Sequence, residues 1–318
     1  MDQFAINKGL MAQCHRSLFM MKGVLKMTLF RELYNGRWGY IFLFPAYFFF
    51  IIFTLVPLIQ GLGFSFYEVG LKERKFIGFG NFIKLAEDQV FWKALINTVL
   101  IVAGGVPTIV ITSLLISALV FPLTRWIQGF FRVAFYLPVV ASGVVLSMVW
   151  LWILHPSYGL LNYLIGLIGM EPIAWLGTPS SALIMIMVVM VSFTLGQPII
   201  LFLAGLGSIP IDLYEAAMID GANARARFFK ITLPLLKPTT LFVTVTQVIG
   251  VFQVFVVVLL LTKGGPANGT QTIVYRMYET AFEFFTFGYA SAIGLVLIVI
   301  IGFISWIQFR FFGQDTEY

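Results

Sequence analysis

Long apolar stretches separated by short polar connections run along most of this chain. Crossing the hydrocarbon core of a bilayer takes a helix of roughly 20 mostly apolar residues. When the chain is cut at charge clusters and at Pro/Gly-rich breaks, six such stretches result, at residues 39–66, 92–120, 131–154, 181–206, 239–262 and 287–309. The pattern predicts an all-α integral membrane protein with six transmembrane helices.

Composition supports this prediction and excludes several other classes. Of the 318 residues, 60% are hydrophobic and only 11% are charged, too few to cover a soluble globule with polar surface. One cysteine and two histidines exclude disulfide-stapled folds and His-rich metal sites. The net charge of +6 does not indicate nucleic acid, because the basic residues follow membrane sidedness instead of forming one stripe.

The basic residues also predict an orientation. Thirteen Lys and Arg lie on one set of connections, formed by 1–38, 121–132, 207–238 and the tail, against seven on the other set. Because cytoplasmic connections carry the excess of Lys and Arg, both termini are predicted to be cytoplasmic. The predicted organisation is a basic amphipathic cytoplasmic segment (1–38), a six-helix transmembrane domain (39–312) and a cytoplasmic tail (313–318).

The sequence lacks motifs for catalysis. It has no phosphate-binding loop, no His-Glu-x-x-His and no Gly-x-Ser-x-Gly, so it is expected to be a non-catalytic subunit that binds no cofactor. Any ATP and Mg would be bound by a partner. The predicted spans hold almost no ionisable residues, which disfavours the alternative of an ion-coupled secondary carrier of a small polar solute.

Neutral amides are the polar groups that stand out within the spans. Asn and Gln are costly to expose to lipid, so Asn97, Gln197, Gln247 and Gln253 should face the helix bundle or a wet cavity. Amides together with aromatic rings suit uncharged polyhydroxyl ligands such as sugars. Most Ser and Thr in the spans are expected to bond to their own helix backbone.

Residues 207–238 form the longest cytoplasmic connection between predicted spans. Pro210 suits the first helical turn, Asp220-Gly221 favours a turn, and Asn223 can cap a second helix that ends at Leu233-Pro234. The connection is therefore predicted to be a helix–turn–helix. Ile211, Tyr214 and Met218 share one helical face, which predicts an apolar ridge that needs a partner to bury it.

This loop resembles the signature of the inner-membrane permease subunits of binding-protein-dependent ABC importers. That signature is Glu-Ala-Ala, three residues, Gly, nine residues, Ile-x-Leu-Pro. Its matches here are Glu215-Ala216-Ala217, Gly221, Ile231 and Leu233-Pro234. The carbohydrate branch of that family, of the maltose and glycerol-phosphate type, is similar also around Pro156 to Asn162, Gly264-Gly265-Pro266 and 278–292.

The resemblance implies a type I ABC importer permease fold in the bacterial cytoplasmic (inner) membrane, as one half of a translocation pathway for a sugar or oligosaccharide. The implied partners are a second homologous permease, two copies of a cytoplasmic ATPase and an extracytoplasmic solute-binding protein. The residues implied to couple to the ATPase are Tyr214, Glu215, Ala216, Ala217, Met218, Asp220 and Gly221.

The resemblance also implies a substrate pathway before the loop and before Gly-Gly-Pro. The residues expected there are Gly196, Gln197, Gln247, Phe252 and Gln253. Gln253 stands in place of an Asn-rich run, and Ile199 stands where the maltose type has an aromatic residue. These differences leave the identity of the sugar open.

Overall fold

The computed structural model describes residues 37–70 and 74–312, so the predicted segment 1–38 lies almost entirely outside the described residues, as does the tail 313–318. The chain divides into two compact units, 1–61 and 62–318. The described chain begins with an apolar helix, α2 (Arg37–Phe50), which continues through one π-helical turn, η1 (Ile51–Leu55), into α3 (Val56–Phe64). At that turn the Val56 N–H donates to the Ile51 carbonyl, five residues back, next to Pro57, which has no N–H to continue the regular pattern.

The second unit begins with a small polar subdomain and a long helix. The strands β1 (Tyr67–Val69) and β2 (Arg74–Phe76) pair antiparallel, with Tyr67 opposite Phe76. They are followed by α4 (Gly80–Glu87) and by α5 (Gln89–Val120), the longest helix of the described chain. Because α5 packs against α9, α10, α14 and α16, it is the central helix of this unit.

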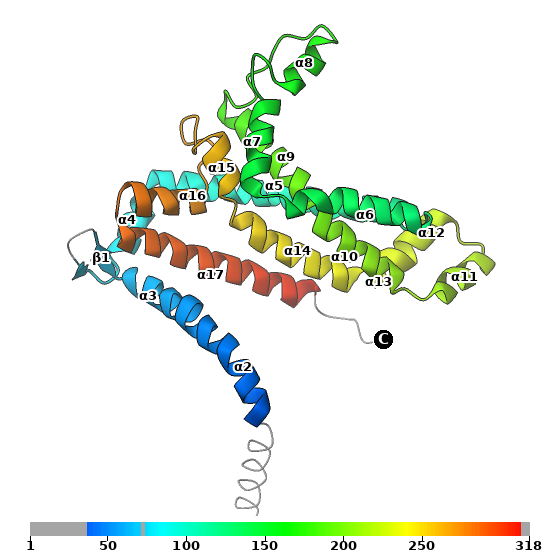
Figure 1. The fold of residues 1–318 in the computed structure, drawn as a ribbon, viewed down its shortest axis with the longest axis horizontal. Helices are drawn as coiled ribbons and strands as arrows, with labels where there is room; N and C mark the ends of the chain where they lie inside the picture. Colours follow the sequence, from blue (N-terminus) through cyan, green and yellow to red (C-terminus); the bar gives the residue numbers. More distant parts are fainter. Residues whose placement is uncertain (1–36, 71–73, 313–318) are drawn as a thin grey trace, which may run out of the picture. The chain divides into compact units, whose positions relative to one another are not determined.

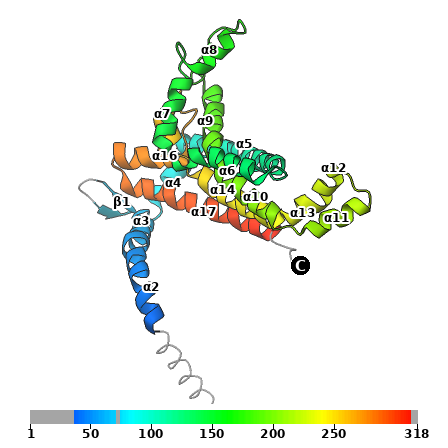
Figure 2. The same cartoon turned by 45° about the vertical axis from the view of Figure 1, so that its right-hand side comes forward.

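Helices from the rest of the chain complete the bundle around α5 (Figures 1 and 2). They are α6 (Arg125–Val140), α7 (Gly143–Ile153), α8 (Leu160–Gly166), α9 (Pro179–Thr194), α10 (Gly196–Gly207), α14 (Lys237–Phe252), α15 (Val256–Leu261), α16 (Ile273–Tyr278), the π-helical turn η3 (Glu279–Glu283) and α17 (Phe287–Phe312). A connection between α10 and α14 holds α11 (Ile211–Ile219), α12 (Ala224–Arg227), the π-helical turn η2 (Phe228–Thr232) and α13 (Leu233–Leu235). Figure 1 shows α11 and α12 at the opposite end of the unit from β1 and α4.

Among the described residues, four helices are long and apolar enough to cross a membrane, at 41–64, 89–120, 237–261 and 287–310. Two further helix pairs satisfy the same test only when each pair is taken together. The pair α6 and α7 bends by 96°, and the pair α9 and α10 bends by 49°. Each predicted span therefore has a helical counterpart, and the described chain has four spans, or up to six if each bent pair is one span.

Three of the six predicted stretches are not regular helices throughout. Residues 131–154 are broken at Ala141 and Ser142, where the Ser142 hydroxyl accepts a hydrogen bond from the Val144 N–H and starts a new helix. Residues 181–206 are bent at Leu195, between α9 and α10. Residues 239–262 are interrupted between α14 and α15, where Phe255 leaves the helical conformation with φ −136° and ψ −59°.

The core of the second unit is joined across long sequence separations by buried polar groups of α5. The Asn97 amide donates to the carbonyls of Asn268 and Gln271, at 3.1 and 3.0 Å. The neighbouring Thr98 hydroxyl accepts from the Ile273 N–H at 3.0 Å. The prediction that Asn97 faces the bundle is confirmed, and the segment 268–273 is fixed against α5 because of it.

Candidate functional site

The loop between α10 and α14 is a helix–turn–helix, as its sequence predicts. Gly221 has φ +78° at the turn, a left-handed conformation that disfavours residues with a Cβ. Asn223 then caps α12, its side-chain oxygen accepting from the Ala226 N–H at 2.8 Å. The predicted end at Leu233-Pro234 is wrong, because Pro234 lies in the first turn of α13, where its missing N–H is tolerated.

The apolar ridge of α11 differs from the predicted one. Ile211 and Met218 are 69% and 52% exposed, but Tyr214 is half-buried, with its hydroxyl 2.8 Å from the Thr232 hydroxyl. Tyr214 therefore connects the two arms of the loop, and Ile219 adds to the exposed apolar surface. Of the other residues implied to couple, Ala217 is half-buried, and the exposed ones are Glu215, Ala216, Asp220 and Gly221.

A central cavity of about 870 Å³ lies among α9, α10, α14, α15, α16 and α17. Three of the predicted pathway residues, Gln197, Gln247 and Gln253, line it together. The described residues lining this cavity include no Asp, Glu, Lys or Arg. The cavity thus presents neutral amides on largely apolar walls, an arrangement that suits a ligand with hydroxyl groups and without full charge.

The threonines of the cavity are satisfied within their own helices. The Thr194 hydroxyl donates to the Met190 carbonyl and the Thr246 hydroxyl to the Phe242 carbonyl, each at 2.8 Å. This is the behaviour predicted for hydroxyls in the spans. Amides therefore supply the main hydrogen-bonding capacity toward a ligand.

Two predicted pathway residues do not line this cavity. Phe252 is 1% exposed and belongs to the hydrophobic core, and the aromatic rings at the cavity are those of Phe193 and Phe255. Gly196 is buried, and a Cβ there would clash with the Phe135 carbonyl and lie 2.8 Å from the Val139 side chain. Gly196 therefore allows close packing of α10 on α6, and the structure does not place it at this cavity.

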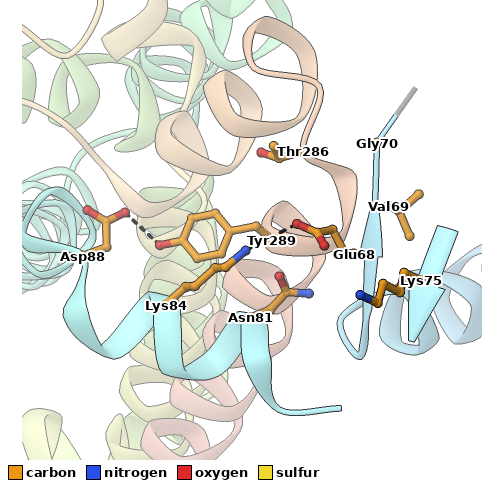
Figure 3. Close-up of a pocket in the computed structure, with 9 residues that line it drawn as sticks. All are labelled: Glu68, Val69, Gly70, Lys75, Asn81, Lys84, Asp88, Thr286 and Tyr289. Carbon is orange, nitrogen blue, oxygen red and sulfur yellow. Dashed lines mark hydrogen bonds and ion pairs between the residues drawn. The ribbon is translucent and has the colours of Figure 1, made fainter. Parts of the chain in front are cut away.

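A smaller polar cavity of about 530 Å³ lies where β1, β2, α4 and α17 meet (Figure 3). In Figure 3 the Asp88 carboxylate and the Tyr289 hydroxyl point toward each other, and Lys84 reaches toward Glu68. The Lys84–Glu68 pair is exposed and separated by 3.5 Å, so it contributes little to stability.

Asp88 is the centre of a network that sequence reasoning did not find. One oxygen caps α5 by accepting from the N–H groups of Val90 and Phe91, at 2.8 and 3.2 Å. The other oxygen accepts from the Tyr289 hydroxyl at 2.8 Å and from Arg276 at 3.1 Å. An Asp directly before a long apolar helix is a signal for a cap, but nothing in the sequence pairs it with residues almost 200 positions later.

Arg276 extends this network to α16 and η3. Its second terminal nitrogen donates to Glu279 at 2.8 Å, and Gln271 donates to the same Glu279 oxygen at 2.9 Å. Burial opposes ionisation of Asp88, but hydrogen bonds from Tyr289 and Arg276 outweigh it and hold the pKa of Asp88 below its usual value. Burial likewise acts against the Arg276 charge, while Glu279 and Asp88 raise the pKa of Arg276.

The fold and these features define an inner-membrane transport component. Residues 115–314 match the family described as binding-protein-dependent transport system inner membrane component, and the chain belongs to this family. The family predicted from the Glu-Ala-Ala loop is confirmed. The chain is accordingly a multi-pass protein of the bacterial cytoplasmic membrane.

Relatives in sequence are permease subunits of named transport systems. The lactose transport system permease protein LacF of Rhizobium radiobacter is 36% identical, over 85% of this chain and 92% of the relative. The multiple sugar-binding transport system permease protein MsmF of Streptococcus mutans is 32% identical, over 89% and 98%. The trehalose/maltose transport system permease protein MalF of Thermococcus litoralis is 31% identical, over 84% and 90%.

The fold is similar to that of a solved transporter. A chain of a bacterial ABC transporter involved in the import of the acidic polysaccharide alginate superposes with a TM-score of 0.79, over 91% of this chain and 99% of that chain. A second structure, of that transporter with a periplasmic protein carrying an alginate pentasaccharide, gives a TM-score of 0.76, over 88% and 95%. Sequence identity is 24% in both, so this similarity concerns the fold.

Proposed function

We propose that this chain is the transmembrane subunit of an ATP-driven sugar importer and forms half of its translocation pathway. The observation that carries the proposal is the central cavity, where three amides meet aromatic and aliphatic side chains among described lining residues that carry no charge. The named relatives transport lactose, trehalose or maltose, and multiple sugars, which agrees with that chemistry. A sugar offers donors and acceptors on its rim and apolar C–H faces, matching both parts of the wall.

The proposed architecture has six spans in the type I importer arrangement, with both termini in the cytoplasm. Each bent helix pair then counts as one broken span. Broken helices are tolerated at membrane depth where they line a cavity, and Gln197 places α10 at one.

Labelling of single cysteines tests this topology. Replacing the one native cysteine, Cys14, by serine gives a suitable background. Cysteines at Lys75, Met170 and Asn268 should react with an impermeant maleimide added outside the cell. Cysteines at Arg125 and Lys230 should react only after the membrane is opened, and external labelling of Lys230→Cys contradicts the orientation.

The proposed partners follow from the exposed loop. The surface formed by Ile211, Met218 and Ile219, with Glu215 beside it, is proposed to dock on a cytoplasmic ATPase, of which two copies bind ATP and Mg. A second homologous permease and an extracytoplasmic solute-binding protein complete the proposed assembly. A tagged chain purified in mild detergent should bring down the ATPase and the second permease, and recovery of this chain alone contradicts the assembly.

Gly221 provides a sharper test of coupling. Asparagine tolerates the left-handed conformation and valine does not, so Gly221→Asn should retain substrate-stimulated ATP hydrolysis where Gly221→Val loses most of it. Both variants should insert and still bring down the second permease, because the change is confined to the exposed turn. Equal stimulation in wild type and Gly221→Val contradicts a coupling role for this turn.

A further inference from the structure

We propose that a second cavity, next to the central one, is a binding subsite for a sugar ring, formed by the side chains of Tyr278 and Phe282. This inference rests on the proposed sugar import function and adds a site to it. The cavity has a volume of about 640 Å³, within the range of roughly 300–1,000 Å³ that is common for small-molecule sites. Its lining residues come from the end of α3, from β1, α16, η3 and α17, and from the break before α15; β1, α16 and α17 are labelled in Figure 1.

Three aromatic rings form a row that leads from this cavity to the central one. The ring centroids of Phe255 and Tyr278 are 5.0 Å apart, and those of Tyr278 and Phe282 are 5.4 Å apart. Phe282 is 62% exposed, and Tyr278 and Phe255 are half-buried. The row therefore begins at an accessible ring and ends at the break between α14 and α15, beside Gln253.

The two cavities are neighbours because they share walls. Phe255, Val274 and Met277 line both of them. On its other side, the cavity lined by Tyr278 and Phe282 shares Val69 and Gly70 with the polar cavity of Figure 3. The subsite thus lies between the polar cavity and the amide-lined cavity, sharing lining residues with each.

The chemistry of the row selects a sugar ring among polar solutes. The face of an aromatic ring carries partial negative charge and attracts the weakly positive C–H groups on one face of a pyranose. A solute without such a face gains nothing from stacking. Because stacking is tolerant of hydroxyl stereochemistry, this subsite would hold a ring while the amides of the central cavity discriminate between sugars.

Uptake by the complete transporter, expressed in cells with its partner subunits and its binding protein, tests the subsite. The probes are radiolabelled glucose, lactose, maltose, trehalose and raffinose, each supplied at a limiting concentration. Tyr278→Leu and Phe282→Leu remove a ring, and Tyr278→Phe retains it. Phe303→Leu is the matched control, because Phe303 is an exposed aromatic residue of α17 that lines none of the three cavities.

Loss of one stacked ring is expected to lower uptake of the transported sugar about three- to tenfold, which at 1.4 kcal/mol per tenfold corresponds to roughly 0.65–1.4 kcal/mol, within the usual aromatic contribution. Tyr278→Phe and Phe303→Leu should remain within twofold of wild type. Wild-type uptake in both leucine variants overturns the subsite while leaving the proposed function intact. If the wild-type transporter takes up none of these sugars, the sugar import proposal fails, and the subsite fails with it.

Discussion

Asp88 forms hydrogen bonds with α5, α16 and α17, so two substitutions at this position can separate the contributions of these bonds to stability. Asp88→Asn keeps an oxygen that can cap α5 but removes the charge facing Arg276. Asp88→Ala removes the cap, the charge and the acceptor for Tyr289 together. The adjacent Glu87, exposed at the end of α4, provides a matched control as Glu87→Asn.

The magnitudes follow from the individual contacts. Loss of the cap costs about 1 kcal/mol, and hydrogen bonds to a charged group contribute roughly 1.5–3 kcal/mol when buried. The Asp88 and Arg276 side chains are both 16% exposed, so solvent screens them only partly. We expect the free energy of unfolding to fall by about 3–5 kcal/mol in Asp88→Ala and by about 1–2 kcal/mol in Asp88→Asn, where only the charge is lost.

The assay is thermal unfolding of the purified chain in detergent, followed by size-exclusion fluorescence. At about 2–4 °C per kcal/mol, the apparent Tm should fall by roughly 6–20 °C in Asp88→Ala and by roughly 2–8 °C in Asp88→Asn. Glu87→Asn should match wild type. An equal fall in both Asp88 variants refutes the capping contribution, and a wild-type Tm in both refutes the network as a source of stability.

The remaining predictions concern pH, the cavity and helix packing. Because folding lowers the pKa of Asp88, the stabilisation that its charge provides is fully present above the unfolded pKa of about 3.9 and is lost as the pH falls through the folded pKa. The Tm difference between wild type and Asp88→Asn should therefore be constant from pH 8 to 5 and shrink below about pH 4. A difference that already shrinks by pH 6 contradicts this direction. Gln253→Leu should lower sugar uptake several-fold, about 0.5–1.5 kcal/mol for one hydrogen bond, with basal ATP hydrolysis unchanged; unchanged uptake removes Gln253 from the pathway. Phe252→Ala should instead lower stability by about 3–5 kcal/mol, measured as a fall in Tm, because its ring fills the core; a Tm equal to wild type contradicts that placement. Gly196→Ala should lower the free energy of unfolding by about 1–3 kcal/mol through overpacking against α6, seen as a fall in Tm, while Gly129→Ala, where a Cβ meets open space, should not; equal effects contradict the close approach.

Features that depend on local sequence could be predicted, and features that depend on packing could not. The spans and the helix–turn–helix follow from hydropathy, from a glycine at a left-handed position and from Asn223 as a cap. The bends at Ser142 and Leu195 were not placed, because the average hydropathy stays high across Ser142-Gly143 and Gly196-Gln197-Pro198, and a glycine or proline within a span does not by itself fix a bend. The family was recognised from one loop motif, which fixes residue spacing without fixing how helices bend.

Gln197, Gln247 and Gln253 line one cavity, as expected for amides that are unfavourable to expose to lipid wherever the helices lie, and their role in a substrate pathway stays a prediction. Phe252 does not reach the cavity wall, because the break after it changes the direction of the chain and brings Phe255 to the wall instead. The Asp88 network was missed because its partners lie 188 and 201 residues away. Nothing in the sequence indicates which of the distant charged residues form pairs.

The bonds from Asn97 and Thr98 to residues 268–273 impose an order on biogenesis. These partners lie 171 to 175 residues apart, so α5 leaves the ribosome long before the groups that satisfy its amide and hydroxyl exist. At about 5–20 residues per second, the delay is roughly 10–30 s. During that interval the nascent helix carries an unpaired amide, whose desolvation costs about 1–3 kcal/mol. Assembly of the bundle around α5 is therefore completed only after synthesis of the last third of the chain, and truncation before residue 268 leaves the helix with that polar group unmatched.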